Sequence, residues 1–155
     1  MIIELHPYKP EYLPEVLSLF RQTVHSVNSK HYTPEQLNAW APEQLDENKW
    51  QQTLGSNYTL VAKQDNKIVG FADIDATGYF DHLFVHRDYQ GQGVAKLLAD
   101  AIENYAQAER LKIISVAASI TAKPFFERRD YKVLKQQSVE RLGQVLTNYL
   151  MEKQV

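Results

Sequence analysis

The chain has 155 residues, which suits a single domain over residues 1–155 with one sizeable core. Its 17 lysines and arginines nearly balance 19 aspartates and glutamates, so the charge predicts no nucleic-acid partner. The absence of cysteine excludes disulfides, thiolate metal sites and cysteine nucleophiles. No apolar run approaches the roughly 18 residues of a membrane helix and no signal peptide is evident, so we expect a cytoplasmic protein without membrane contact.

The N-terminal third is mostly helical in its pattern. A short strand is predicted over residues 2–5, and residues 10–28 then carry apolar side chains at helical spacing. Thr33, Pro34 and Gln36 indicate the start of a short helix, because threonine caps, proline suits the first position and glutamine completes a capping box. A third helix is predicted over residues 46–54.

The remaining two thirds alternate between strands and helices. Strands are expected over residues 58–63, 67–75, 79–85 and 113–117, the last one buried at the centre of a sheet. Helices are expected over residues 91–110 and 121–129, and a closing hairpin over residues 132–141 and 144–151. This order predicts a mixed α/β fold.

The most informative segment is residues 83–98, where an apolar run and a polar loop lead through Gly91 and Gly93 into an amphipathic helix. Glycines at the first turn of a helix let a ligand approach unpaired backbone N–H groups, and the helix dipole makes these groups attractive to anions. The segment therefore predicts a site for a phosphate or pyrophosphate.

Two common phosphate-binding motifs fit this segment poorly. A nucleotide triphosphatase loop needs lysine and then serine or threonine after its second glycine, but Val94 and Ala95 stand there. A dinucleotide fold needs a third glycine where the chain has Lys96.

A third motif matches better. The run Gln90-Gly91-Gln92-Gly93-Val94-Ala95 resembles the Gln/Arg-x-x-Gly-x-Gly/Ala signature of the GNAT superfamily of N-acetyltransferases. Residues 119–131 are similar to that family's second acyl-CoA segment, Asn-x-x-Ala-x-x-x-Tyr-Glu-x-x-Gly-Phe. The resemblance covers the chain from about residue 58 onward. It implies a central mixed sheet of about six or seven strands flanked by helices. It also implies that an acetyl group moves from acetyl-CoA to a primary amine, which attacks the thioester directly.

The resemblance also implies the residues that hold the co-substrate. Backbone N–H groups of residues 90–95 would bind the diphosphate, and the backbone of strand residues 84 and 85 would pair with the pantetheine arm. Ser119 stands where the family commonly has asparagine. Phe126 stands where it often has the tyrosine that protonates the leaving thiolate, so that role is vacant or filled elsewhere. The expected cofactor-binding residues are Phe84, Val85, Gln90, Gly91, Gln92, Gly93, Val94, Ala95, Ser119 and Phe126.

A general base is needed because an alkylamine must lose a proton before it attacks. His82 is the preferred candidate because histidine titrates near neutrality, and Asp81 is the reserve. Adjacent strand residues face opposite ways, so both can point into one cleft only if the strand has a bulge. His82 and His86 would lie roughly 13 Å apart along a strand, too far to share an ion, and we expect no metal site.

The acceptor side is less defined by the sequence. His31 and Tyr32 precede a helix cap and are candidates for exposed acceptor recognition, whereas Trp40 and Trp50 fit a core. Asp73 and Asp75, on the strand predicted over residues 67–75, could pair with a cationic acceptor, although such carboxylates commonly face solvent. The acceptor is a small molecule or a peptide, and the C-terminal hairpin could support a homodimer. The alternative function is a sensor module that binds acyl-CoA without turning it over.

Overall fold

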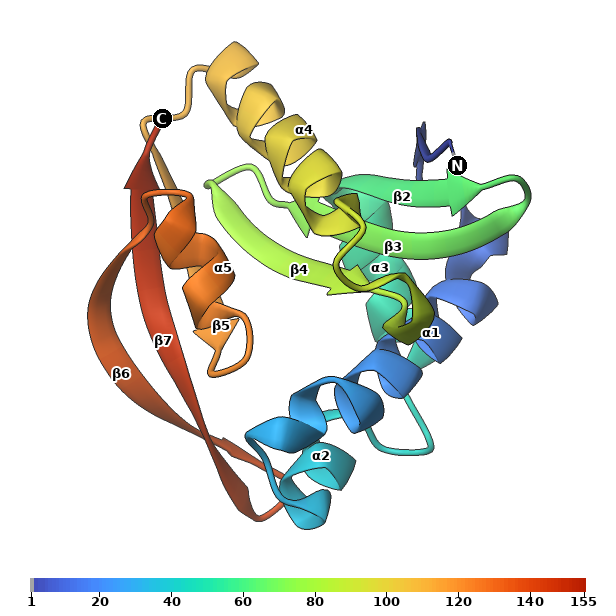
Figure 1. The fold of residues 1–155 in the computed structure, drawn as a ribbon, viewed down its shortest axis with the longest axis vertical. Helices are drawn as coiled ribbons and strands as arrows, with labels where there is room; N and C mark the ends of the chain where they lie inside the picture. The colour runs from blue at the N-terminus through green and yellow to red at the C-terminus, as the bar shows by residue number, and fades with distance from the viewer. Residues whose placement is uncertain (1) are drawn as a thin grey trace.

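The computed structural model describes residues 2–155 and contains a seven-stranded sheet in the order β1-β2-β3-β4-β5-β7-β6 (Figure 1). Neighbouring strands are antiparallel except for β4 and β5, which run parallel. The strands are β1 (Glu4–Pro7), β2 (Tyr58–Gln64), β3 (Lys67–Ile74), β4 (Tyr79–Val85), β5 (Ile113–Ser119), β6 (Lys132–Arg141) and β7 (Gln144–Gln154).

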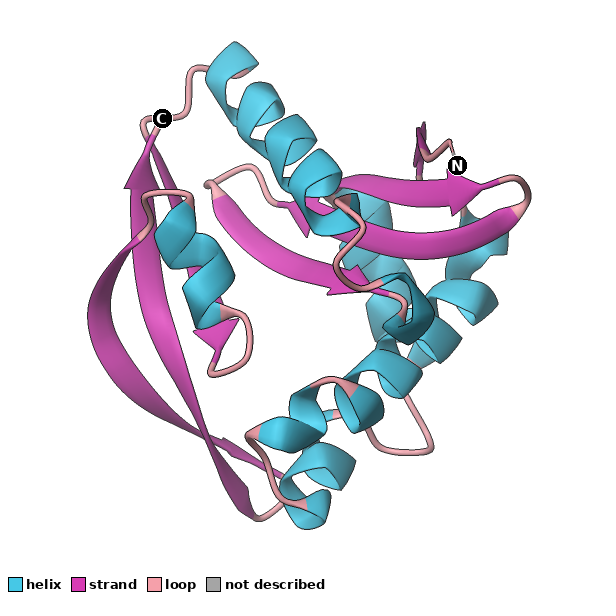
Figure 2. Cartoon of the chain, in the orientation of Figure 1, coloured by secondary structure: helices cyan, strands magenta, loops and turns pink. Residues whose placement is uncertain are grey.

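Helices cover both faces of the sheet (Figure 2). One core layer contains side chains of α1 (Leu13–Ser26), α2 (Pro34–Trp40) and α3 (Glu47–Ser56). The other contains side chains of α4 (Val94–Ala108) and α5 (Lys123–Arg128). Alternate residues of each strand point into these two layers, because successive strand side chains face opposite ways.

The predicted mixed α/β fold is confirmed, and most element boundaries shift by only a few residues. The predicted capping box of α2 is present: the Thr33 side chain accepts from the Gln36 N–H, and the Gln36 side chain accepts from the Thr33 N–H. Helix α4 begins at Val94 rather than at residue 91, because Gly91 and Gly93 have φ values of 71° and 83°, which a right-handed helix cannot include. None of the helices in residues 2–155 has the length and apolar character needed to span a bilayer.

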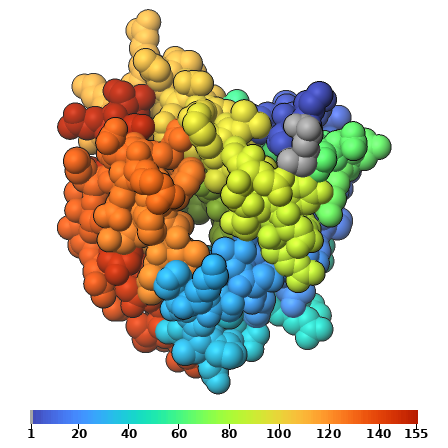
Figure 3. All heavy atoms as spheres, viewed as in Figure 1, coloured from blue at the N-terminus to red at the C-terminus, as the bar shows by residue number. Residues whose placement is uncertain are grey.

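Strands β4 and β5 separate soon after they meet. They share two residue pairs, Tyr79 with Ser115 and Phe80 with Val116. The next residue, Asp81, is the extra one where the register of β4 with β3 shifts, and this shift is a β-bulge. A bulge bends the strand that carries it, so β4 turns away from β5 directly after their last shared pair. Figure 3 shows an opening at this place, bordered by α5 in orange, the segment after β4 in yellow and α1 with α2 in blue.

Candidate active site

After Phe80, the edge of β4 that faces the opening is not paired with another strand. His86 N–H donates to the Val69 carbonyl on β3, at 2.8 Å. Because backbone groups of consecutive residues alternate between the two edges of a strand, those of Leu83 and Val85 point toward the opening. Those of Phe84 point toward β3, where Phe84 pairs with Phe71. The expectation that the Phe84 backbone faces the opening is therefore wrong, whereas the Val85 backbone has the expected orientation.

The Val85 carbonyl is already engaged. It accepts hydrogen bonds from the Gln90 side chain at 2.7 Å and from the Thr23 hydroxyl at 3.1 Å. The Gln90 amide is thus turned back toward β4 rather than toward a diphosphate, which leaves only its backbone for anion binding. The Val85 N–H stays available at the opening.

The glycine loop presents the start of α4 to solvent. Gly93 is the N-cap residue of α4 and provides no side-chain cap, and the first α-helical hydrogen bond runs from Leu97 N–H to the Gly93 carbonyl. The N–H groups of Val94, Ala95 and Lys96 therefore lack partners within the helix. A Cβ atom placed on Gly91 or Gly93 would meet nothing within 4 Å. An anion has room to approach these N–H groups, so the loop fits a diphosphate.

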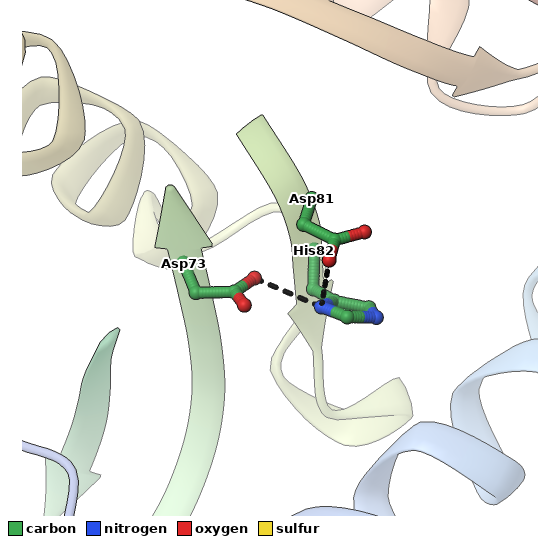
Figure 4. Close-up of side chains that lie close together, drawn as sticks. All are labelled: Asp73, Asp81 and His82. Carbon is green, nitrogen blue, oxygen red and sulfur yellow. Dashed lines mark hydrogen bonds and ion pairs between the residues drawn. The ribbon is translucent and has the colours of Figure 1, made fainter. Parts of the chain in front are cut away.

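His82 and Asp73 form a hydrogen-bonded pair across β4 and β3 (Figure 4). Nδ1 of His82 donates to Oδ1 of Asp73 at 2.8 Å, and Oδ2 of Asp73 accepts from the Asn57 side chain at 2.9 Å. Asp73 is 0% exposed, so the expectation of a solvent-facing carboxylate is wrong. These two hydrogen bonds offset the cost of burying the carboxylate.

Asp81 lies on the other side of the same histidine nitrogen, with Oδ2 at 3.9 Å from Nδ1 (Figure 4). Adjacent strand side chains reach the same site only where the strand has a bulge, and β4 has one at Asp81, so Asp81 and His82 both reach this site. Nε2 of His82 points away from both carboxylates, and no side chain or backbone group of residues 2–155 bonds to it. This nitrogen is the one that remains for a ligand.

The two carboxylates determine the proton affinity of His82. Burial alone would lower the pKa of His82, but the hydrogen bond to Asp73 and the charges of Asp73 and Asp81 outweigh it, so the pKa is raised. Burial raises the pKa of Asp81, and nearby His82 opposes part of that rise. The arrangement is an imidazole held in one orientation, with a carboxylate ready to stabilise its protonated form.

Aromatic rings surround His82 on the side of α1, α2 and α3. The Trp50 ring lies 4.7 Å from the His82 ring and 31° from parallel with it. Phe84 lies 6.3 Å from His82, and Trp40 lies 6.2 Å from Phe84. Both tryptophans pack against the core as predicted, yet both keep partial exposure. Trp50 is a site residue that the sequence did not reveal.

His31 and Tyr32 lie at different depths. His31 is exposed, with Nδ1 at 2.8 Å from the Thr121 hydroxyl. Tyr32 is 7% exposed, so its predicted exposure is wrong. Its hydroxyl donates to the Thr147 carbonyl at 2.7 Å and accepts from the Ile120 N–H at 2.9 Å. Tyr32 therefore holds the ends of β5 and β7 together.

The two residues of the second motif also differ. The Ser119 hydroxyl oxygen accepts from the Ala122 N–H at 3.0 Å, and Asn28 Nδ2 lies 3.4 Å from it, which leaves its proton free to donate. Phe126 is 3% exposed and packs in the core against Phe80 and Tyr131. Its expected contact with the co-substrate is corrected to a structural position, because almost none of its side chain reaches the surface.

Among residues 2–155, one group of side chains could hold a metal ion, and it differs from the pair of His82 and His86 considered from the sequence. Asp73, Asp81 and His82 each offer a ligand atom, and these atoms lie within 4.8 Å of one another. Nδ1 of His82 and Oδ1 of Asp73 are at hydrogen-bond distance, so a proton lies between them in this arrangement.

Comparisons with known proteins agree on one family. A family model described as an acetyltransferase (GNAT) domain matches residues 28–153. The chain is 37% identical over 150 residues to the uncharacterized N-acetyltransferase YafP of Escherichia coli, covering 96% of this chain and 94% of that protein. A crystal structure of a GCN5-related N-acetyltransferase from Rhodopseudomonas palustris, also described as a class-II aminotransferase, is 34% identical. It has a TM-score of 0.94 and covers 100% of this chain and 99% of that one.

A more distant structure shows the same fold. It is the PaiA N-acetyltransferase of Thermoplasma acidophilum in complex with coenzyme A, 16% identical, with a TM-score of 0.82 and full coverage of both chains. The sequence matches place the chain in the GNAT family of acetyltransferases. The glycine loop, the second motif at residues 119–131 and the separation of β4 from β5 agree with this.

Proposed function

We propose that this protein is an N-acetyltransferase that moves the acetyl group of acetyl-CoA to a primary amine, with His82 as the general base. The observation that carries the proposal is the pair of His82 and Asp73 on β4 and β3, next to the free edge of β4. A sensor that only binds acyl-CoA has no need for a buried carboxylate that orients a histidine.

The chain offers groups for three parts of acetyl-CoA, which supplies the acetyl group as a thioester: the diphosphate, the pantetheine arm and the thioester carbonyl. The N–H groups at the start of α4 suit the diphosphate, and Gly91 and Gly93 leave the space that it needs. Backbone groups of Leu83 and Val85 suit the pantetheine arm as an added strand would. The Val85 N–H suits the thioester carbonyl oxygen, which gains negative charge during the reaction. The PaiA structure with coenzyme A supports this assignment by its shared fold.

His82 performs the proton transfer. Nε2 takes a proton from the amine nitrogen, and the Asp73 carboxylate stabilises the imidazolium that forms. The amine nitrogen forms a bond to the acetyl carbon while the carbon–sulfur bond breaks. The sulfur leaves with the electron pair of that bond, and protonation then gives free coenzyme A. A thiol with a pKa near 8.5 leaves without full protonation, so the phenyl ring at Phe126 does not block the reaction.

The test is replacement of His82 by alanine. We expect kcat for thiol release with a panel of primary amines to fall by about 10²- to 10⁴-fold, because the amine loses its base. The Kd for acetyl-CoA, measured by calorimetry, should stay unchanged because His82 does not hold the diphosphate. His6→Ala, at a partly exposed histidine on β1, is the matched control and should behave as the wild type. Equal kcat and equal pH profiles in H82A would contradict the role of His82. Tight acetyl-CoA binding with no amine accepted would instead favour the sensor.

A further inference from the structure

Among the buried side-chain nitrogen and oxygen atoms of residues 2–155, one has no hydrogen-bond partner, the carbonyl oxygen Oδ1 of Asn148 on β7. The other buried side-chain polar atoms in this part of the chain are paired, including both oxygens of Asp73. A buried carbonyl without a donor destabilises the fold, so such a group needs an explanation, and a bound ligand that donates to it is one.

Asn148 faces the same side of the sheet as His82. On β7, Leu146 packs into the core layer of α1 and α2, whereas Met151 packs into the layer of α4 and α5. Because strand side chains alternate, Asn148 shares the face of Leu146. By the same alternation its partner on β5, Ser119, faces that side too, since Ala118 packs under α4.

A wall of aromatic rings leads from His82 to the neighbourhood of Asn148. The Phe84 ring lies next to His82, the Trp40 ring lies next to Phe84, and the Tyr32 ring lies 5.5 Å from the Trp40 ring. The Tyr32 hydroxyl then bonds to the carbonyl of Thr147, which is adjacent to Asn148 in the chain. His82 and the Asn148 amide are therefore two polar groups on one apolar surface, on opposite sides of the opening between β4 and β5.

At the end of this surface that lies near Asn148, α2 and the segment before it are bonded to the segments around β5 and β7. The Gln36 side chain donates to the Val145 carbonyl at 2.8 Å, and His31 contacts Thr121, so the segment before and within α2 is tied to the ends of β5 and β7. A polypeptide that ran through the site would have to break these contacts. A small molecule would not.

We infer that the acceptor is a small primary amine with a second hydrogen-bond donor, a hydroxyl or another amine, and that Asn148 Oδ1 binds this donor. The inference rests on the proposed function, because it places the reacting nitrogen at His82 Nε2. Asn148 is then a specificity residue. An amine that lacks the second donor leaves the carbonyl unpaired, and sites of this kind discriminate strongly against such analogues.

The experiment compares n-alkylamines of two to six carbons with their ω-hydroxy and ω-amino counterparts, as substrates of the wild type and of Asn148→Leu. For at least one chain length, we expect the wild type to use a donor-bearing amine about tenfold better in kcat/KM than the matched alkylamine. N148L should bring this ratio to about one and leave the Kd for acetyl-CoA unchanged. N148L should also raise the melting temperature, because it removes an unpaired buried carbonyl, whereas a structural role for Asn148 would lower it.

Gln136→Leu is the matched control, since Gln136 is exposed on β6 opposite Tyr149 and should leave the ratio unchanged. Asn148→Ala repeats the comparison if N148L does not fold. Equal use of the matched amines by the wild type, or a preference kept in N148L, overturns the inference. If no amine releases thiol, the proposed function fails, and NMR of the Asn148 side-chain amide in the coenzyme A complex decides the inference. A shift with a donor-bearing amine and not with its alkylamine upholds it, and no shift overturns it.

Discussion

The glycine loop and the His82–Asp73 pair lie at the two ends of the free edge of β4, but they are built in different ways. The loop uses backbone N–H groups of neighbouring residues, and the positive φ values of its glycines determine its shape. The pair uses side chains from β3 and β4, with a third from Asn57 after α3. A site made of backbone follows from local residues, whereas a site made of side chains depends on how distant segments pack.

The largest expected effect is at the loop, where Gly93→Val should abolish measurable acetyl-CoA binding in calorimetry. A β-branched residue at φ 83° costs about 1–2 kcal/mol, and its side chain occupies the space of the diphosphate. Gly55→Ala, in α3, is the control: Gly55 has open space around it, a φ that is not positive and no role in the loop, so affinity should stay the same. Unchanged affinity in G93V would show that the loop does not hold the diphosphate.

The next effect is at the pair, where Asp73→Asn should lower kcat/KM by roughly tenfold or more, since the imidazolium loses its stabilising charge. The pKa of His82 should fall because the hydrogen bond to a carboxylate is lost, so the acidic limb of the pH profile moves to lower pH. Asp81→Asn should move the limb in the same direction by less, because Asp81 lies farther from Nδ1. If the acidic limb of the pH profile lies at the same pH in D73N as in the wild type, the group that titrates there is not His82.

A smaller effect concerns stability and pH. The raised pKa of His82 in the folded protein means that protonated His82 stabilises the fold fully below its unfolded pKa near 6.5. This stabilisation is lost as the pH rises through the folded pKa. The melting temperature of the wild type, compared with that of His82→Gln, should therefore fall as the pH rises. The fall should begin near pH 6 and end once the pH is above the pKa of His82 in the folded protein. Parallel melting curves over this range would contradict the raised pKa.

The smallest effect is expected at a purely local feature, the cap of α2. Thr33→Ala removes the side chain that accepts from the Gln36 N–H and should cost about 1 kcal/mol, or roughly 2–4 °C in melting temperature. Acetyl-CoA affinity should not change. Ser138→Ala, at an exposed position on β6 where the hydroxyl makes no hydrogen bond within residues 2–155, is the control and should melt as the wild type does. An unchanged melting temperature in T33A would mean that tertiary contacts alone hold α2.

The sequence predicted what local chemistry determines. The cap at Thr33, the turn of the closing hairpin between residues 141 and 144, and the loop at Gly91 and Gly93 all follow from residue types with particular backbone preferences, and the structure has them. The start of α4 was predicted too early, because hydrophobic periodicity does not register that a glycine has a positive φ.

The site side chains were harder to predict, because their partners are distant in sequence. Neither a contact with a cationic acceptor nor exposure to solvent, the two roles considered for Asp73, anticipates its bond to His82. Asp73 is the one charged residue after Lys67 in an otherwise apolar strand, and this pattern is the available signal for a buried, paired carboxylate. Tyr32 has no such signal, since the bonds of its hydroxyl join residues 88 and 115 positions away. Register and long-range packing decide both cases.

The bulge at Asp81 implies that one residue controls how far β4 separates from β5. Deleting Asp81 would leave Phe80 opposite Ile74 and His82 opposite Asp73, so the His82–Asp73 pair would survive the deletion intact. The shortened strand would lose its bend and could continue its ladder with β5 past Val116. The result would be a continuous sheet in which His82 still bonds to Asp73, but β4 and β5 would leave no opening between them for a thioester.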